Sequence, residues 1–253
     1  MSEELIVEAQ TLISKATEEA ALLRTLGGLA IKYHCPSASQ PPLIRSIADI
    51  DLFGLSKQTK QIKKSFIDLS YVPAQQFNAL HGKTRLMFFE PKNHVRRDVF
   101  LDTFVMCHRF DFRNRLGIDP FTISLSDLLM TKLQVVQIEE RDYKDLVCMF
   151  ADHELATEDA QERINARYVA EMCSGDWGIY KTFTQNLDKT LGYLKELNLD
   201  GAKKAGVEQR INELKDTIQK IPKSLKWKAR DRVGDKMVWY ELPEAPKAIK
   251  FEE

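Results

Sequence analysis

The sequence lacks features that mark several large classes of protein. Its 253 residues contain only four cysteines, Cys35, Cys107, Cys148 and Cys173, which are far apart and form no C-x-x-C pair. This spacing is unlike a disulfide framework or a zinc site and fits reduced thiols, so we expect a cytoplasmic protein. No run of about 18 apolar residues is present, which argues against a membrane span. Residues 1–10 are acidic and amphipathic, unlike a secretory signal.

The chain also has no excess of charge of either sign. Lysine plus arginine equals aspartate plus glutamate, at 37 each. No general basic field therefore favours nucleic acid, and RNA binding would require a local patch. Apolar residues make up 43% and charged residues 29%, which is typical of a globular protein with one large domain or a domain with a helical extension. No P-loop or kinase signature is present.

What the sequence does contain is a pair of carboxylates in a strand-like segment. Residues 44–53 read IRSIADIDLF, and alternation of side chains along a strand puts Asp49 and Asp51 on one face. Two like charges side by side repel, and the nearest basic residue is Arg45. A hard cation such as Mg²⁺, shared with phosphate oxygens, is the simplest compensation. The alternative is an Asp pair exposed at the solvent end of the strand.

A third carboxylate would be needed beside this pair to hold two metal ions. Asp98 lies in the middle of the strand-like residues 95–106, where a charge is unfavourable unless it is paired or bound to metal. Asp102 shares its face and is the second candidate. The alternative for Asp98 is a structural ion pair with Arg96 or Arg97.

The remaining pattern predicts an α/β (α+β) fold with a mixed sheet, flanking helices and a mostly helical C-terminal part. Apolar spacing predicts helices over residues 2–24, 29–34, 56–69 (with Ser56 as N-cap), 73–82, 126–138, 139–155, 157–173, 177–197 and 202–221. Residues 84–90 and 95–106 are predicted to pair as a hairpin. A small β-hairpin with its turn at residues 233–236 is predicted to end the fold.

These residues resemble a known superfamily. Its pattern is a Gly-Gly pair, an arginine four residues before an Asp-x-Asp strand and a further aspartate on a later strand, matched here by Gly27, Gly28, Arg45, Asp49, Asp51 and Asp98. This is similar to the nucleotidyltransferase superfamily related to DNA polymerase beta. Residues 125–134 and 141–150 resemble the branch that contains abortive-infection toxins and their uncharacterised prokaryotic relatives. The tail motif at residues 176–187 looks like a subgroup of them.

The resemblance implies a site and a division of the chain. In this branch a helical lysine and a later Lys-Asp pair complete the pocket, and the matching positions are Lys132 and Asp145, with Lys144 a weaker match. Residues 1–155 would form the catalytic domain with its pocket-closing helices, and residues 156–253 a helical region. Lys132 would contact a phosphate, or else be a solvated lysine. Asp145 would orient Lys132, contact base or ribose, or pair with Arg141.

The implied activity is an enzyme that moves a nucleoside monophosphate from an NTP such as ATP to a hydroxyl. Mg²⁺ held by the catalytic Asp49, Asp51 and Asp98 would bridge the phosphates, and the third aspartate could act as a general base. The Gly-Gly backbone and Arg45 would approach the triphosphate, or Arg45 would brace the aspartates. The acceptor would be an RNA end (a tRNA, for example), a protein or a small molecule.

Two departures from the superfamily pattern motivate a different class of function. Gly28 stands where many relatives have a serine, and Ile47 where a hydroxyl residue is common. The alternative is a catalytically silent nucleotide- or partner-binding module with a cognate antitoxin-like protein. A phosphotransferase using the γ-phosphate is a third option. The basic tail with Trp227 and Trp239 is either an RNA surface or a docked hairpin with a solvated face.

Overall fold

A five-stranded mixed sheet forms the centre of the N-terminal half. The computed structural model describes residues 2–243. The strands are β1 (Leu23–Leu26), β2 (Ile50–Gly54), β3 (Val72–Pro73), β4 (Arg85–Phe89) and β5 (Arg96–Leu101), in the order β1-β2-β5-β4-β3. The β2–β5 pair is parallel and the other pairs are antiparallel. The predicted mixed α/β fold is therefore confirmed.

One face of this sheet is closed by two helices. Helices α1 (Ser2–Glu18) and α3 (Thr59–Asp68) cover the face that carries the apolar residues of the central strands. Leu52 and Val99 are fully buried there, and the rings of Phe66 and Phe88 stack with centroids 4.0 Å apart. Because strand side chains alternate, the polar residues Asp51 and Asp98 lie on the opposite face. Helix α4 (Gln75–His81) packs on the outer part of that opposite face through Met87 and Phe89.

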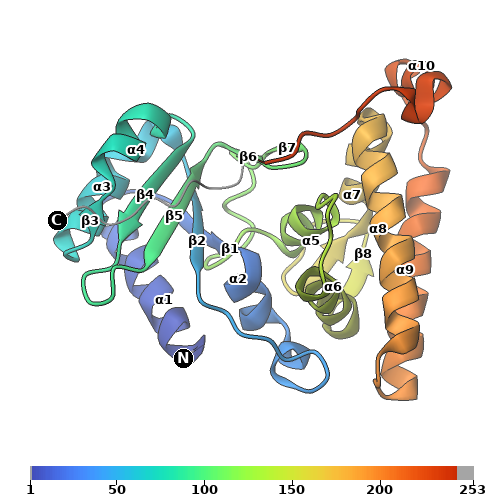
Figure 1. Cartoon of the computed structure of the whole chain (residues 1–253), viewed down its shortest axis with the longest axis horizontal. Helices are drawn as coiled ribbons and strands as arrows, with labels where there is room; N and C mark the ends of the chain where they lie inside the picture. Colours follow the sequence, from blue (N-terminus) through green and yellow to red (C-terminus); the bar gives the residue numbers. More distant parts are fainter. Residues whose placement is uncertain (1, 244–253) are drawn as a thin grey trace.

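The helical part of the chain faces the sheet across α2 (Gly27–His34), as Figure 1 shows. It consists of α5 (Leu125–Leu133), α6 (Glu140–Asp152), α7 (Ala166–Gly175), α8 (Trp177–Glu196) and α9 (Gly201–Lys220). Its core is continuous with the sheet, since Leu26 and Phe53 belong to the same buried cluster as Val207 and Ile211 of α9. Asp176 caps α8 by accepting hydrogen bonds from Gly178 N and Ile179 N. The helices are therefore fixed relative to the strands by shared packing.

Several predicted elements are wrong in detail. The helix predicted over residues 2–24 ends at Glu18, and the buried run Leu23–Leu26 is strand β1. Ser56 is not an N-cap, because its hydroxyl and its N–H both bind Asp102 and it opens a short 3₁₀ turn before α3. Helix α5 begins one residue early, capped by Ser124. Residues 157–165 are not helical, and β8 (Glu154–Ala156) and β9 (Arg163–Asn165) pair there instead.

The predicted C-terminal hairpin is also wrong for the described residues. Residues 225–233 form helix α10 (Leu225–Val233), whose first turn is capped by the hydroxyl of Ser224 accepting from Trp227 N. Gly234, with φ of +56°, ends that helix and opens a short 3₁₀ turn (Gly234–Lys236). Beyond this turn the N–H of Glu241 donates to Cys107 O. No helix within residues 2–243 is both long and apolar enough to cross a membrane.

Candidate active site

The sheet register places two of the predicted carboxylates side by side. Asp51 of β2 is the direct partner of Asp98 on the parallel strand β5, so both side chains project from the same level of the same face. Asp49 lies just before β2 and is exposed. Burial, Asp98 and Asp49 raise the pKa of the Asp51 carboxyl from 3.8 to about 6, and Arg85 and Lys132 are close enough to oppose that rise. The carboxylates are therefore crowded, as the sequence predicts.

Asp49 and Asp51 differ from Asp98 in their partners. Within the described part of the chain, the side chains of Asp49 and Asp51 make no hydrogen bond and no ion pair. Asp98 has three such contacts: its Oδ1 accepts a hydrogen bond from Arg85 Nε at 3.0 Å, and its Oδ2 forms ion pairs with Arg85 at 2.9 Å and with Arg96 Nε at 2.8 Å. The predicted alternative, an ion pair of Asp98 with Arg96, is thus present. Sequence reasoning missed Arg85, which reaches Asp98 from the neighbouring strand.

The Gly-Gly pair lies directly against Asp51. Gly27 follows β1 with φ of +72° and opens α2, and a Cβ built on it would lie 3.0 Å from Asp51 Oδ2. No side chain caps the N-terminus of α2. The first N–H groups of a helix have no partner within the helix and favour anions. A phosphate group held next to Asp51 would therefore meet backbone donors on the Gly27 side.

The second wall of the site comes from α5 and α6. Asp145 is buried and accepts hydrogen bonds from Arg45 Nε and from a second Arg45 nitrogen, each at 2.7 Å. It also forms an ion pair with Lys132 Nζ at 2.7 Å. Lys132 also contacts Asp142 at 3.2 Å. Of the interpretations left open by the sequence, the structure places Asp145 as the residue that orients Lys132 and Arg45. It does not pair with Arg141, which contacts Glu139.

Sequence reasoning missed Asp142 although a signal for it was present. Asp142 lies three residues before Asp145 on α6, so both face Lys132. It also closes a capping box with Glu139 at the start of α6. The two weaker candidates lie elsewhere: Asp102 binds Ser56, and Lys144 pairs with Glu140 at 3.0 Å.

The donor chemistry of this site fits a hard cation in part. Asp49 and Asp51 offer carboxylate oxygens without partners, which is the ligand type that Mg²⁺ prefers alongside phosphate and water. Among residues 2–243, however, no three His, Cys, Asp or Glu side chains are arranged to ligate one metal ion. Asp98 is engaged by Arg85 and Arg96, so it can join Asp49 and Asp51 as a ligand only by exchanging those arginines.

The close approach of Arg45 gives a first prediction. A Cβ built on Gly28 would lie 2.3 Å from a terminal nitrogen of Arg45, so the guanidinium fills the space that a serine would need. We expect Gly28→Ser to displace Arg45 from Asp145 and to lower the free energy of unfolding by about 1–2 kcal/mol. Denaturant titration measures this change. Because the loss comes from Arg45, the same substitution in an Arg45→Ala background should be nearly neutral, and equal losses in both backgrounds would contradict the explanation.

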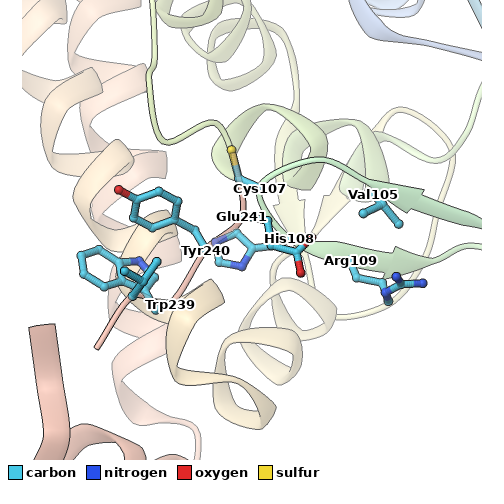
Figure 2. Close-up of a pocket in the computed structure, with 8 residues that line it drawn as sticks. Val105, Cys107, His108, Arg109, Trp239, Tyr240 and Glu241 are labelled. Atoms are coloured by element: carbon cyan, nitrogen blue, oxygen red, sulfur yellow. The ribbon is translucent and has the colours of Figure 1, made fainter. Parts of the chain in front are cut away.

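A hollow lies away from the carboxylates. A cavity of about 340 Å³ separates the hairpin of β6 (Thr103–Val105) and β7 (Arg109–Asp111) from the extended tail. Figure 2 shows Trp239 and Tyr240 on one side of His108, and Val105 and Arg109 on the other. The hairpin follows the far end of β5 from Arg96, so this cavity is not part of the carboxylate site. The neighbouring Cys107 is a free, buried thiol, as are the other three cysteines.

The structure thus brings Gly27, Gly28, Arg45, Asp49, Asp51, Asp98, Lys132 and Asp145 around one face of the sheet. Comparison of the chain with protein-family models, with curated proteins and with solved structures found no match in any of the three. The nucleotidyltransferase assignment therefore stays a prediction, and the geometry of the site is what supports it.

Proposed function

We propose that this protein is a Mg²⁺-dependent nucleotidyltransferase that moves a nucleoside monophosphate from an NTP to a hydroxyl and releases pyrophosphate. The observation that carries the proposal is the position of Asp51. Its carboxylate has no ion-pair or hydrogen-bond partner in the described chain, it is crowded by Asp98 and Asp49, and it lies against the uncapped N-terminus of α2. A crowded carboxylate without a partner destabilises the folded protein unless a cation binds beside it.

The groups around Asp51 have distinct roles in this proposal. The α2 N-terminus at Gly27 and Gly28 binds the triphosphate through backbone N–H groups. Bound Mg²⁺, held by Asp49 and Asp51 and joined by Asp98, would neutralise phosphate charge and stabilise the leaving pyrophosphate. The acceptor oxygen forms a bond to the α-phosphorus while the α–β phosphoanhydride bond breaks, and the hydroxyl proton passes to a carboxylate of the site.

Lys132 and Arg45 add little net charge to the site. Both contact Asp145, and Lys132 also contacts Asp142, so two cations face two carboxylates. Their contribution is therefore their position rather than their net charge. Asp145 holds Arg45 beside Gly28 and Lys132 close enough to Asp51 to affect its pKa, so a phosphate oxygen can take over one of their contacts. Arg45 would bind in a forked manner, whereas Lys132 would act as a point charge.

A calorimetric titration of NTP in the presence of Mg²⁺ tests the binding half of the proposal. We expect micromolar affinity for the native protein, and loss of about tenfold or more in the Asp49→Ala/Asp51→Ala variant, because the cation that links carboxylate to phosphate is no longer held. Binding should vanish when EDTA replaces Mg²⁺. Equal affinity with and without Mg²⁺ would contradict the cation site.

One observation favours a second candidate function, a catalytically silent module that binds a nucleotide or a cognate antitoxin-like protein. Arg85 and Arg96 already neutralise Asp98, as in a purely structural ion pair. Mg²⁺-dependent NTP binding without any transfer would favour this alternative. In either case the four free thiols fit the reducing environment of the cytoplasm.

A further inference from the structure

Helix α10 has one side turned toward the protein and one side turned toward solvent. Figure 1 shows this helix at one end of the molecule. Trp227 is buried and packs against Tyr180 of α8, with ring centroids 5.1 Å apart, so the opposite side of α10 faces outward. Residues three, four and seven positions apart share one side of a helix. The outer side of α10 therefore carries four exposed residues, Leu225, Lys228, Ala229 and Arg232.

The positive charges on and around this outer side are not neutralised. The α10 cations are Lys226, Lys228 and Arg232 of the helix and Lys236 of the turn that follows it. Within residues 2–243 their side chains form no hydrogen bond and no ion pair. The two acidic residues of this segment are bound by α8 instead: Asp231 accepts from Trp177 Nε1 at 2.6 Å, and Asp235 pairs with Lys181 at 3.1 Å. The outer side of α10 is left with positive charge only.

Apolar side chains are exposed in the same segment. Leu225, on the outer side of α10, is 85% exposed. Met237 and Val238, which follow the 3₁₀ turn, are 61% and 77% exposed. An aliphatic side chain gains free energy when it leaves water for the hydrocarbon boundary of a bilayer, and gains little beside a phosphate chain. Unpaired cations together with exposed aliphatic residues are typical of helices that lie on an anionic lipid surface.

The aromatic residues near α10 are occupied by contacts within the protein. Trp227 and Trp177 are buried. Trp239 donates from Nε1 to Thr182 Oγ1 at 3.1 Å and lies edge-on to Trp177, with ring centroids 5.8 Å apart. Proteins that bind single-stranded nucleic acid stack the bases on aromatic rings, and these rings are not free to do so. Three of the four α10 cations are lysines, which act as point charges and not as phosphate-matching forks. A lipid surface therefore fits α10 better than a nucleic acid strand.

We propose that the outer side of α10 docks the protein on the anionic surface of a lipid bilayer. The α10 cations attract the acidic headgroups, and Leu225 enters the boundary between the headgroups and the acyl chains. This contact requires no membrane-spanning helix, and it does not rest on the proposed nucleotidyl transfer. The central sheet and α10 lie on opposite sides of the molecule in Figure 1, so a lipid surface on α10 does not cover the carboxylates of the sheet.

Co-sedimentation of the full chain with vesicles tests the proposal. One set of vesicles contains phosphatidylcholine with about one third phosphatidylserine, and the other contains phosphatidylcholine alone. Lys228→Gln/Arg232→Gln removes two charges from the outer side, and Leu225→Ser leaves the charge unchanged. The control Lys57→Gln/Lys60→Gln removes the same charge from two exposed lysines at the start of α3. Single-stranded RNA is titrated in parallel against all four proteins.

We expect binding only to the vesicles that contain phosphatidylserine, and weaker binding at higher salt because salt screens the charges. Lys228→Gln/Arg232→Gln should weaken vesicle binding roughly 25-fold, from about fivefold for each charge. Leu225→Ser should weaken it about fivefold through lost apolar burial, and the control should bind as the native protein does.

Three results would overturn the proposal. The first is binding of RNA, weakened in Lys228→Gln/Arg232→Gln, without binding of vesicles, which would make α10 a nucleic acid surface. The second is vesicle binding that either outer-side variant leaves unchanged, because charge alone or apolar area alone does not describe the proposed contact. The third is no binding to vesicles or to RNA.

Discussion

Replacing Asp51 by asparagine is expected to abolish nucleotidyl transfer while making the protein more stable. Transfer should fall by about 10³-fold, or ~4 kcal/mol in the barrier, because the amide cannot hold the cation that neutralises the phosphates. Stability should rise by about 2 kcal/mol at neutral pH without Mg²⁺, since the amide removes a charge that burial, Asp98 and Asp49 disfavour. If Asp51 had a structural role instead, the same substitution would destabilise the protein.

The pH dependence of stability tests the predicted stabilisation by Asp51→Asn independently. The pKa of Asp51 is raised from 3.8 to about 6 in the folded protein, so between pH 4 and 6 the folded state binds more protons than the unfolded state, and stability falls as pH rises. The stability difference between Asp51→Asn and the native protein should therefore be near zero at pH 4 and reach its full value by pH 7. Denaturant titrations at these pH values measure it.

Two controls make this prediction sharp. Asp188→Asn removes an exposed carboxylate of α8 that pairs with Lys215, and it should not stabilise the protein at any pH. Mg²⁺ should raise the melting temperature of the native protein and leave that of Asp51→Asn unchanged. If Asp51→Asn were less stable than the native protein at pH 7, the account of Asp51 as a crowded carboxylate without a partner would be wrong.

Removing Asp145 is expected to give the largest loss of stability at the site. Asp145 is buried and binds both Arg45 and Lys132, each at 2.7 Å. Asp145→Ala leaves these two cations beside each other with only Asp142 to offset them, and breaking a buried ion pair in this way typically costs about 3 kcal/mol. For a chain of this size that is a fall of roughly 6–12 °C in melting temperature. Calorimetric unfolding measures the fall.

The partner variant tests the mechanism of this loss. Arg45→Met in the Asp145→Ala background removes one of the uncompensated charges, so the double variant should be more stable than Asp145→Ala alone. Additive losses from the two substitutions would mean that the pairing seen between Arg45 and Asp145 contributes no coupling. If Asp145→Ala lowers the free energy of unfolding by less than about 1 kcal/mol, these ion pairs stabilise the protein no more than a surface salt bridge does.

Local spacing allowed much of the site to be predicted. The strand that carries Asp51 and the face on which Asp51 lies follow from alternation, whereas Asp49, predicted in the same strand, lies just before β2 (Ile50–Gly54). Arg45 and the Gly-Gly pair were found through a resemblance that depends on short spacings. The contact of Arg45 with Asp145, 100 residues later, had no such signal. Neither did the contact of Arg85 with Asp98, because it depends on the register of β4 against β5. Asp142 was missed although its spacing from Asp145 indicated a shared face.

The errors in secondary structure have a common physical cause. Residues 23–26 are buried along their whole length, so β1 shows no polar alternation, and its apolar residues continued the helical spacing of α1. In the tail, alternation of basic and aromatic residues predicted a hairpin. The Ser224 cap and the burial of Trp227 favour helix α10 instead. In both places tertiary packing and capping override the pattern on which the prediction depended.

The measurement that tests nucleotidyl transfer most directly is transfer of a label from the α-phosphate of each NTP in the presence of Mg²⁺. RNA, cell protein and a metabolite extract serve as separate acceptors, with Asp49→Ala/Asp51→Ala as the control protein and γ-labelled NTP as the control substrate. We predict α-label in one of these acceptors, none from the γ-label, and none with the control protein. Label only from the γ-phosphate would show a phosphotransferase. If a folded protein that binds Mg²⁺–NTP labels no acceptor, nucleotidyl transfer is contradicted. The catalytically silent binding module is then the remaining proposal.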